Sequence, residues 1–453
     1  MRLSMFRRSL LPLVASLGLA VGFFLLPIPG QADQWTDLTR RIEALRQQID
    51  RGEATDELRQ KMATLLRIRS TQPDLAADER LGYLQEALEF APDDERLAYE
   101  LARAGYEVGD ANLAYEHIQR ALALAPEDFH NQLLAGFICR SLLRYDEAVN
   151  FLEKARDLKP DHVPTLISLG RTYAELRQFD RAIDVWETAL TMRPSSEEAA
   201  ELRERIEKAQ RQEAATGGGD AMESHRFVVQ FSGPTRDDLA AMALDTLDEV
   251  FDLVAGELQV KPEGKVFVVF YRKADFHQVN DSQGWVGGYA QNLRIGVPYE
   301  DGPLDGPRIK SLFAHELTHI LVNVLTNRNH PAWLTEGLAE YYEAKVRYGD
   351  GFAFHPADRH LFETKFKTLP SFPRLNAIEL NMKTKGNDEE ISLKYIHSKV
   401  AVAFLLQRFG LPALLEIFQV LARGRPIEEA IESGTGRNMS DFETELTEFI
   451  RAE

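Results

Sequence analysis

The residues best suited to chemistry in this chain form the pentapeptide His315-Glu316-Leu317-Thr318-His319. If this segment is helical, its two imidazoles lie one turn apart and can bind one Zn²⁺ ion, while Glu316 can act as a base on a water bound to that ion. The alternative is a pair of ordinary histidines on an amphipathic helix. The pentapeptide alone does not distinguish a zinc site from ordinary histidines. The elements around it have to provide that distinction.

The sequence around the pentapeptide predicts a helix that begins near Pro307. Its apolar positions follow helical spacing and form a wide stripe, made of Ile309, Leu312, Phe313, Leu317, Ile320, Leu321 and Val324. At about 100° per residue, His315 and His319 lie about 40° apart on the flank of this stripe. Both imidazoles can therefore point into one cleft while the apolar stripe anchors the helix behind them.

A second predicted helix follows, and it carries the segment Trp333-Leu334-Thr335-Glu336-Gly337-Leu338-Ala339. With the pentapeptide, this segment resembles the gluzincin metallopeptidases, in which H-E-x-x-H lies on one helix and a W-L-x-E-G-x-A segment lies on the next. The resemblance implies that His315, His319 and Glu336 are the metal ligands. It also implies one Zn²⁺ per chain and Glu316 as the catalytic base.

The same resemblance implies roles for residues outside the ligand set. Glu340, one turn after Glu336, would orient a ligating histidine, and its alternative is an exposed helix acid. Tyr395 is expected to donate to the developing oxyanion, with His397 as the other candidate. The segment Gly287-Gly288-Tyr289 is expected either to form an edge strand that binds substrate or simply to turn the chain.

The C-terminal half, residues 226–453, is expected to form one α+β domain. Alternating or continuous β-branched and aromatic runs predict strands at Arg226–Phe231, Lys265–Tyr271, Val286–Ala290 and Leu293–Val297. A long amphipathic helix is predicted over Thr235–Leu258, and the pattern from Pro307 onward is helical. This order predicts a small sheet that precedes the helices of the site.

The N-terminal half repeats with a period of 34 residues, which is clearest in Pro92, Pro126, Pro160 and Pro194. Small residues recur at the same period where two helices would cross: Ala102, Gly136 and Gly170. This pattern resembles the tetratricopeptide repeat, in which a proline ends the second helix. The resemblance implies repeats and a capping helix over 93–212, preceded by a helical lead-in with a degenerate first repeat over 33–92.

Two segments flank these domains. Residues 213–225 are expected to be a Gly-rich linker, because Gly217-Gly218-Gly219 has little to hold it in a helix or strand. Residues 1–32 are expected to be a signal peptide, with arginines followed by the uncharged apolar run 9–26 and a break at Pro27. The mature chain is then periplasmic or secreted. If residues 9–26 stay uncleaved, they become a membrane anchor.

Composition excludes some classes of function. The net charge of −18 argues against nucleic acid, or an anionic membrane surface, as the main partner. The single cysteine, Cys139, excludes an intramolecular disulfide.

Together these features predict an α-helical tetratricopeptide solenoid followed by an α+β zincin-like metallopeptidase domain. The function expected is that of an exported zinc peptidase, whose repeat array recruits protein or peptide substrates or partner proteins. One alternative is a periplasmic adaptor or chaperone with a degenerate peptidase-like domain, which the intact Glu316 disfavours. Another is hydrolysis of a non-protein amide, such as a cell-wall peptide, at the same site.

Overall fold

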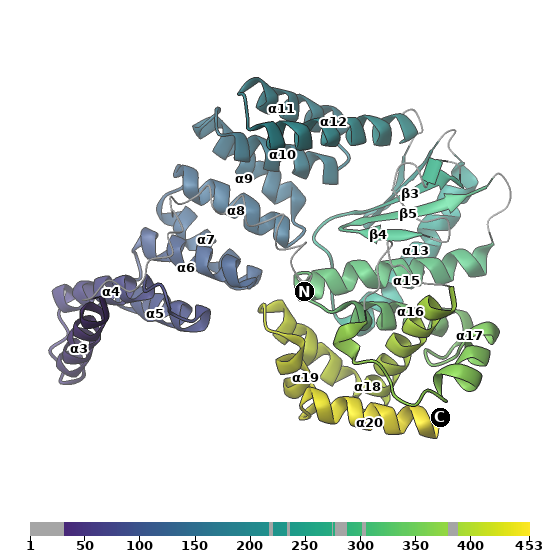
Figure 1. Cartoon of the computed structure of the whole chain (residues 1–453). Coiled ribbons are helices and arrows are strands. Elements are labelled where there is room, and N and C mark those ends of the chain that lie inside the picture. Colours follow the sequence, from purple (N-terminus) through teal and green to yellow (C-terminus); the bar gives the residue numbers. More distant parts are fainter. Residues whose placement is uncertain are drawn as a thin grey trace.

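The structure is a computed structural model that describes residues 31–216, 221–232, 236–273, 275–276, 288–300, 305–378 and 388–453. The apolar run 9–26 and Gly287 lie outside these ranges. Paired helices make up the N-terminal part, and a sheet covered by helices makes up the C-terminal part (Figure 1).

The N-terminal part is a solenoid of antiparallel helix pairs. Its helices are α3 (Gln31–Asp50), α4 (Asp56–Ser70), α5 (Ala77–Phe90), α6 (Glu95–Val108), α7 (Ala111–Leu124), α8 (Phe129–Ser141), α9 (Tyr145–Leu158), α10 (Val163–Glu175), α11 (Phe179–Thr191) and α12 (Ser196–Thr216). The pairs α6–α7, α8–α9 and α10–α11 are the three predicted repeats. Figure 1 shows them as one curved array that ends beside the sheet.

Small residues stand where the paired helices cross, as their period predicts. A Cβ atom on Gly136 would lie 2.6 Å from the Leu152 side chain, and one on Gly170 would lie 2.3 Å from Trp186 Nε1. Both separations are too short for a carbon atom, so only glycine permits these two helix pairs to approach as closely as they do.

The turn inside each repeat has the same backbone conformation. Gly109, Leu143 and Arg177 lie at equivalent positions of successive repeats, with φ angles of 89°, 62° and 59°. These left-handed angles favour glycine, and the second and third repeats reach them with larger residues. We call these three positions, with the residues that flank each of them, the repeat turns.

The C-terminal domain is built on a five-stranded sheet of order β1-β2-β3-β5-β4. Its strands are β1 (Met222–Glu223), β2 (Phe227–Phe231), β3 (Val266–Arg272), β4 (Tyr289–Gln291) and β5 (Arg294–Tyr299). β2, β3 and β5 run parallel, whereas β1 and β4 run antiparallel to their neighbours β2 and β5. One face of the sheet packs with α13 (Asp237–Leu258) and α15 (Gly306–Thr326) in the main core of the domain.

The predicted linker 213–225 is wrong at both of its ends. Helix α12 continues to Thr216, and β1 pairs with β2 through Met222 and Val229. The sequence contains no strong strand signal at 222–223, because so short a strand exists only through its pairing with a distant segment.

Three helices form the base of the domain around the site: α15, α16 (Ala332–Tyr348) and α18 (Asp388–Ala422). Gly337 is the point at which α16 approaches α18, since a Cβ atom there would lie 2.1 Å from the carbonyl oxygen of Ser398. Gly410, at φ 82° and ψ 171°, kinks α18, and Pro412 follows the kink. The smaller elements α17 (Pro356–Leu361), η2 (Phe362–Phe366), η3 (Leu375–Ala377), α19 (Ile427–Thr435) and α20 (Met439–Ala452) complete the domain.

Helix α18 is long and apolar enough to cross a membrane by length and composition alone. Half of its most apolar window is buried inside the domain, however. Val400, Ala401 and Leu405 are fully covered by neighbouring elements. Packing in the domain core therefore accounts for its apolar sequence.

We predict that Gly337→Ala lowers the free energy of unfolding by about 1 to 3 kcal/mol, because the methyl group has to push α16 away from α18. Gly256→Ala in α13 is the matched control: nothing lies within 4 Å of its Cβ position. The control should stabilise the protein by about 0.5 to 1 kcal/mol through helix propensity. Urea unfolding of both variants measures this, and equal stabilities would contradict the role given to Gly337.

Candidate metal centre

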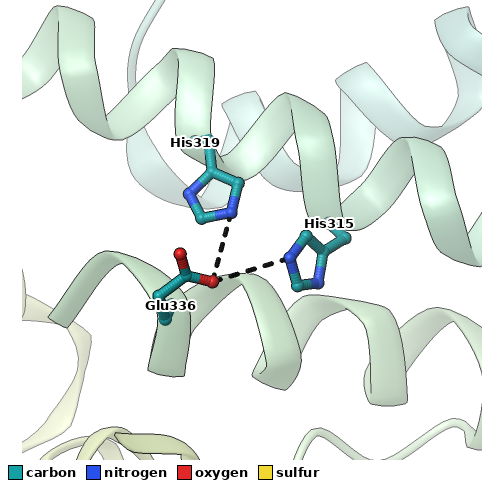
Figure 2. A group of neighbouring side chains, drawn as sticks. All are labelled: His315, His319 and Glu336. Carbon is teal, nitrogen blue, oxygen red and sulfur yellow. Dashed lines mark ion pairs between the residues drawn. The ribbon is translucent and has the colours of Figure 1, made fainter. Parts of the chain in front are cut away.

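Two facing helices bring the three predicted ligands together. His315 and His319 lie on α15, Glu336 lies at the start of α16, and both imidazoles point toward the carboxylate (Figure 2). Glu336 Oε2 is 3.8 Å from His315 Nε2 and 3.5 Å from His319 Nε2. One ligand atom from each residue lies within 4.8 Å of the others, a spacing at which all three can bind one metal ion.

The outer nitrogen of each imidazole is held by a partner from α16. His319 Nδ1 lies 3.0 Å from Thr335 Oγ1, and His315 Nδ1 lies 3.1 Å from Glu343 Oε2. These contacts fix the orientation of both rings and leave each Nε2 atom turned toward Glu336. The sequence pattern did not single out Thr335 or Glu343.

The carboxylate that orients His315 is therefore Glu343 and not the predicted Glu340. Glu340 Oε1 is 3.9 Å from His315 Nδ1, beyond hydrogen-bond distance. Glu336, Glu340 and Glu343 follow one another at helical spacing on one face of α16. Because all three share that face, the spacing offers two candidate partners, and the crossing of α15 over α16 decides between them.

The imidazoles and carboxylates shift one another's protonation. Burial opposes the charge on His315, but the hydrogen bond to Glu343 and the nearby carboxylates outweigh it and raise its pKa to about 10. Burial also opposes the charge on Glu336, and the proximity of His319 nevertheless lowers the pKa of that carboxyl group. For Glu340, burial and the charge of Glu343 raise the pKa to about 7.

A buried lysine faces the same group of carboxylates. Lys399 on α18 is only 4% exposed, and its Nζ atom donates to the carbonyl oxygen of Ala353. Burial lowers the pKa of this lysine, and the charges of Glu340 and Glu343 act in the opposite direction. Lys399 therefore supplies positive charge near Glu340 and Glu343.

Glu316 is 5% exposed and lies beside the ligand set. Burial raises the pKa of its carboxyl group, although His315 and His319 pull it down. A Cβ atom on Gly288 would lie 2.9 Å from Glu316 Oε1. The glycine directly before β4 therefore leaves the space that this carboxylate occupies.

The described residues of the predicted segment Gly287-Gly288-Tyr289 have different surroundings. Gly287 lies outside the described residues, and Gly288 reaches the site. Tyr289 begins β4 and packs with Tyr271 and Phe276 on the sheet face away from the main core. Among the described strands β4 is an edge strand that pairs only with β5, which agrees with the first of the two alternatives for this segment in its backbone conformation.

The two candidate oxyanion donors, Tyr395 and His397, have different surroundings in the structure. Both lie inside α18, where residues two positions apart point in different directions. Burial raises the pKa of the Tyr395 phenol, and this residue lies near enough to the site for the charges of Glu336, Glu340 and Glu316 to raise it further. His397 is 3% exposed, packs against Phe366 and Phe372, and its pKa is lowered by burial to about 4.

Two family models match the chain. Residues 277–452 match the Peptidase MA superfamily, and residues 144–206 match a tetratricopeptide repeat. These matches confirm the predicted order of the two domains.

Among characterised proteins, the chain is similar to Cell division cycle protein 16 homolog of Homo sapiens, with 27% identity over 120 residues. The match covers 24% of this chain and 19% of that protein. The Mus musculus homolog matches with the same identity and coverage. The chain thus spans about a fifth of the length of these relatives.

Solved structures with similarity include MamA, at 18% identity and a TM-score of 0.29, covering 39% of this chain and 99% of that one. YrrB, described as a TPR protein with an unusual peptide-binding site, has 17% identity and a TM-score of 0.32, covering 38% and 86%. MamA from Desulfovibrio magneticus RS-1 has 20% identity and a TM-score of 0.29, covering 34% and 97%. From the family matches, this chain carries a Peptidase MA superfamily domain C-terminal to tetratricopeptide repeats.

Proposed function

We propose that this protein is a zinc-dependent metallopeptidase that hydrolyses peptide bonds. The observation that carries the proposal is the convergence of His315, His319 and Glu336 within 4.8 Å of one another. Two imidazole nitrogens and one carboxylate oxygen are a ligand set of catalytic zinc sites, which keep a further position open. The hydrogen bonds to Thr335 and Glu343 strengthen the fit, since zinc-binding imidazoles carry such partners on their other nitrogen.

Zinc bound at these residues supplies a Lewis acid that lowers the pKa of a coordinated water toward neutrality and polarises a carbonyl. Glu316 takes the proton from the attacking water and delivers it to the leaving amine. Burial raises the pKa of Glu316, which suits a group that has to hold the proton between these two steps.

Tyr395 donates its phenolic proton in a hydrogen bond to the oxygen on which negative charge develops. Its raised pKa keeps the phenol protonated at neutral pH, so the donor is present throughout the reaction. His397 takes no part, because its ring is packed among phenylalanines.

The substrate backbone binds along β4 as an added strand. Among the described strands β4 pairs only with β5, and Gly288 lies directly beside Glu316. An extended peptide paired with β4 therefore passes the base that acts on it. Main-chain pairing of this kind favours unfolded protein segments as substrates.

The proposed peptidase is exported and acts in the periplasm or outside the cell. The basis is the signal-like sequence of residues 1–32, with a membrane anchor at 9–26 if that segment is kept. The repeat array recruits substrate or partner proteins on its solenoid surface. A protein adaptor without catalysis is the competing proposal.

We predict that Glu316→Gln retains zinc but lowers kcat for an unstructured protein at least about 100-fold, because the proton acceptor is lost. Glu336→Gln should lose both zinc and cleavage. Metal analysis and casein hydrolysis measure these outcomes. Stoichiometric zinc in the wild type without Glu316-dependent cleavage would contradict the peptidase and favour the adaptor.

A second prediction separates the two carboxylates near His315. Glu343→Gln replaces the charged acceptor of the His315 Nδ1 proton with a neutral amide and should weaken zinc binding about 10- to 100-fold. Glu340→Gln is the matched control on the same helix face and should change zinc affinity much less. Chelator competition at neutral pH measures both affinities, and a larger loss in the Glu340 variant would reverse the assignment.

A third prediction concerns the oxyanion donor. Tyr395→Phe keeps the ring and removes the hydroxyl, so kcat should fall about 100- to 1,000-fold with little change in zinc content. His397→Leu should lower thermal stability but keep most of kcat, because that ring only packs in the core. Comparable losses of kcat in the two variants would argue against Tyr395 as the donor.

A further inference from the structure

The repeat array contacts the peptidase domain through all three repeat turns. At the first turn, Gly109 lies against Gly424, with 3.6 Å between its Cβ position and the Gly424 Cα atom. At the second, Leu143 is 2% exposed and belongs to the main core of the peptidase domain. At the third, Leu176 packs against that same core. The array therefore meets the domain with one edge, along which equivalent residues repeat.

The second repeat turn holds the bend between β4 and β5. Arg328, just after α15, donates from Nη2 to the hydroxyl of Tyr145 at 3.2 Å and to Asn292 Oδ1 at 2.6 Å. Tyr145 follows the second repeat turn, and Asn292 forms the bend between the strands at φ 57°. One guanidinium group thus ties this bend to the array.

The third repeat turn holds the first residue of β5. Arg294 is 7% exposed, and its Nη2 atom donates to the carbonyl oxygen of Ala174 at 3.3 Å. The same nitrogen is 3.6 Å from Glu175 Oε2, which compensates its buried charge. Arg294 pairs with Gln291 across the two strands, so this contact also fixes the end of β4.

The opposite end of β4 lies at the candidate catalytic residues. Gly288, directly before Tyr289, stands where any side chain would meet Glu316. β4 runs only from Tyr289 to Gln291, so the segment that touches the base is a few residues from the segment gripped by the array. A strand this short, with one strand neighbour among the described residues, gains little order from its own ladder.

We propose that the repeat array positions the substrate-binding edge of the peptidase, by clamping the β4–β5 bend through Tyr145, Arg328 and Arg294. These three are positioning residues: they touch neither metal ligands nor Glu316, and they act through β4. The inference rests on the proposed function, because it assigns β4 the task of aligning a peptide beside Glu316. The array then positions the substrate-binding strand β4, in addition to offering a surface that recruits substrates or partners.

The test uses the full chain with Arg328→Asn, which removes both hydrogen bonds. Asparagine tolerates the left-handed backbone at this position (φ 64°), and Arg328 is exposed, so the core is left intact. Arg181→Ala is the matched control, since Arg181 Nη2 donates to Tyr173 at 2.6 Å and to Glu153 at 2.8 Å entirely within the array. Tyr145→Phe is the conservative variant, which removes one hydroxyl.

We expect Arg328→Asn to lower kcat/KM for an unstructured protein about 10- to 100-fold, mainly through KM, with zinc content unchanged. Amide hydrogen exchange across residues 288–294 should become about tenfold faster. Tyr145→Phe should shift both readouts in the same direction by less, and Arg181→Ala should shift neither.

Exchange and kcat/KM that match the wild type in Arg328→Asn would overturn the inference, even in an active peptidase. Equal effects of Arg328→Asn and Arg181→Ala would also overturn it, because they would show a general loosening of the array. If the wild type shows no Glu316-dependent cleavage, the proposed function fails. Faster exchange confined to Arg328→Asn and Tyr145→Phe would then still support the clamp on β4.

Discussion

Mutual repulsion among closely spaced, largely shielded carboxylates is the constraint on which this domain depends. Glu336, Glu340 and Glu343 lie around two imidazoles, Glu316 lies near enough to feel their charge, and Lys399 faces Glu340 and Glu343. Such a group is stable only when positive charge balances it. Despite burial, the hydrogen bond to Glu343 and the nearby carboxylates raise the pKa of His315 to about 10, and burial and the charge of Glu343 raise that of Glu340 to about 7, so the group favours bound protons. A divalent cation satisfies the same need with one ion, so charge as well as ligand geometry favours its binding.

Glycine residues allow the elements that hold these groups to pack closely together. Gly337 lets α16 approach α18, and Gly288 makes room for the Glu316 carboxylate at the edge of the sheet. At Gly337 the missing side chain lets two helix backbones come together. At Gly288 it lets the backbone approach a carboxylate. The chemistry of the site therefore depends on glycines that carry no functional group of their own.

Much of this arrangement could be predicted from the sequence, because it follows from periodicity. The 34-residue repeat and the helices α15 and α16 follow from spacing along single elements, whereas the joining of Glu336 to His315 and His319 was implied by the resemblance to the gluzincin metallopeptidases. What could not be predicted depends on contacts between distant segments: the choice of Glu343 over Glu340, and the strand at 222–223. The sequence could have separated Tyr395 from His397, because residues two positions apart on a helix point to roughly opposite faces.

The left-handed repeat turns have a consequence for the evolution of this protein. Solenoids usually gain and lose repeats freely, because each unit contacts only its neighbours. Here Leu143 and the residues beside Arg177 are each matched to a different part of the peptidase domain. Deleting one repeat would bring the wrong repeat turn to each contact in the peptidase domain. The β4–β5 bend would then lose the repeat turn that holds it. The docking contacts therefore depend on the number and order of these repeats, whereas a repeat added before α3 would leave them in place.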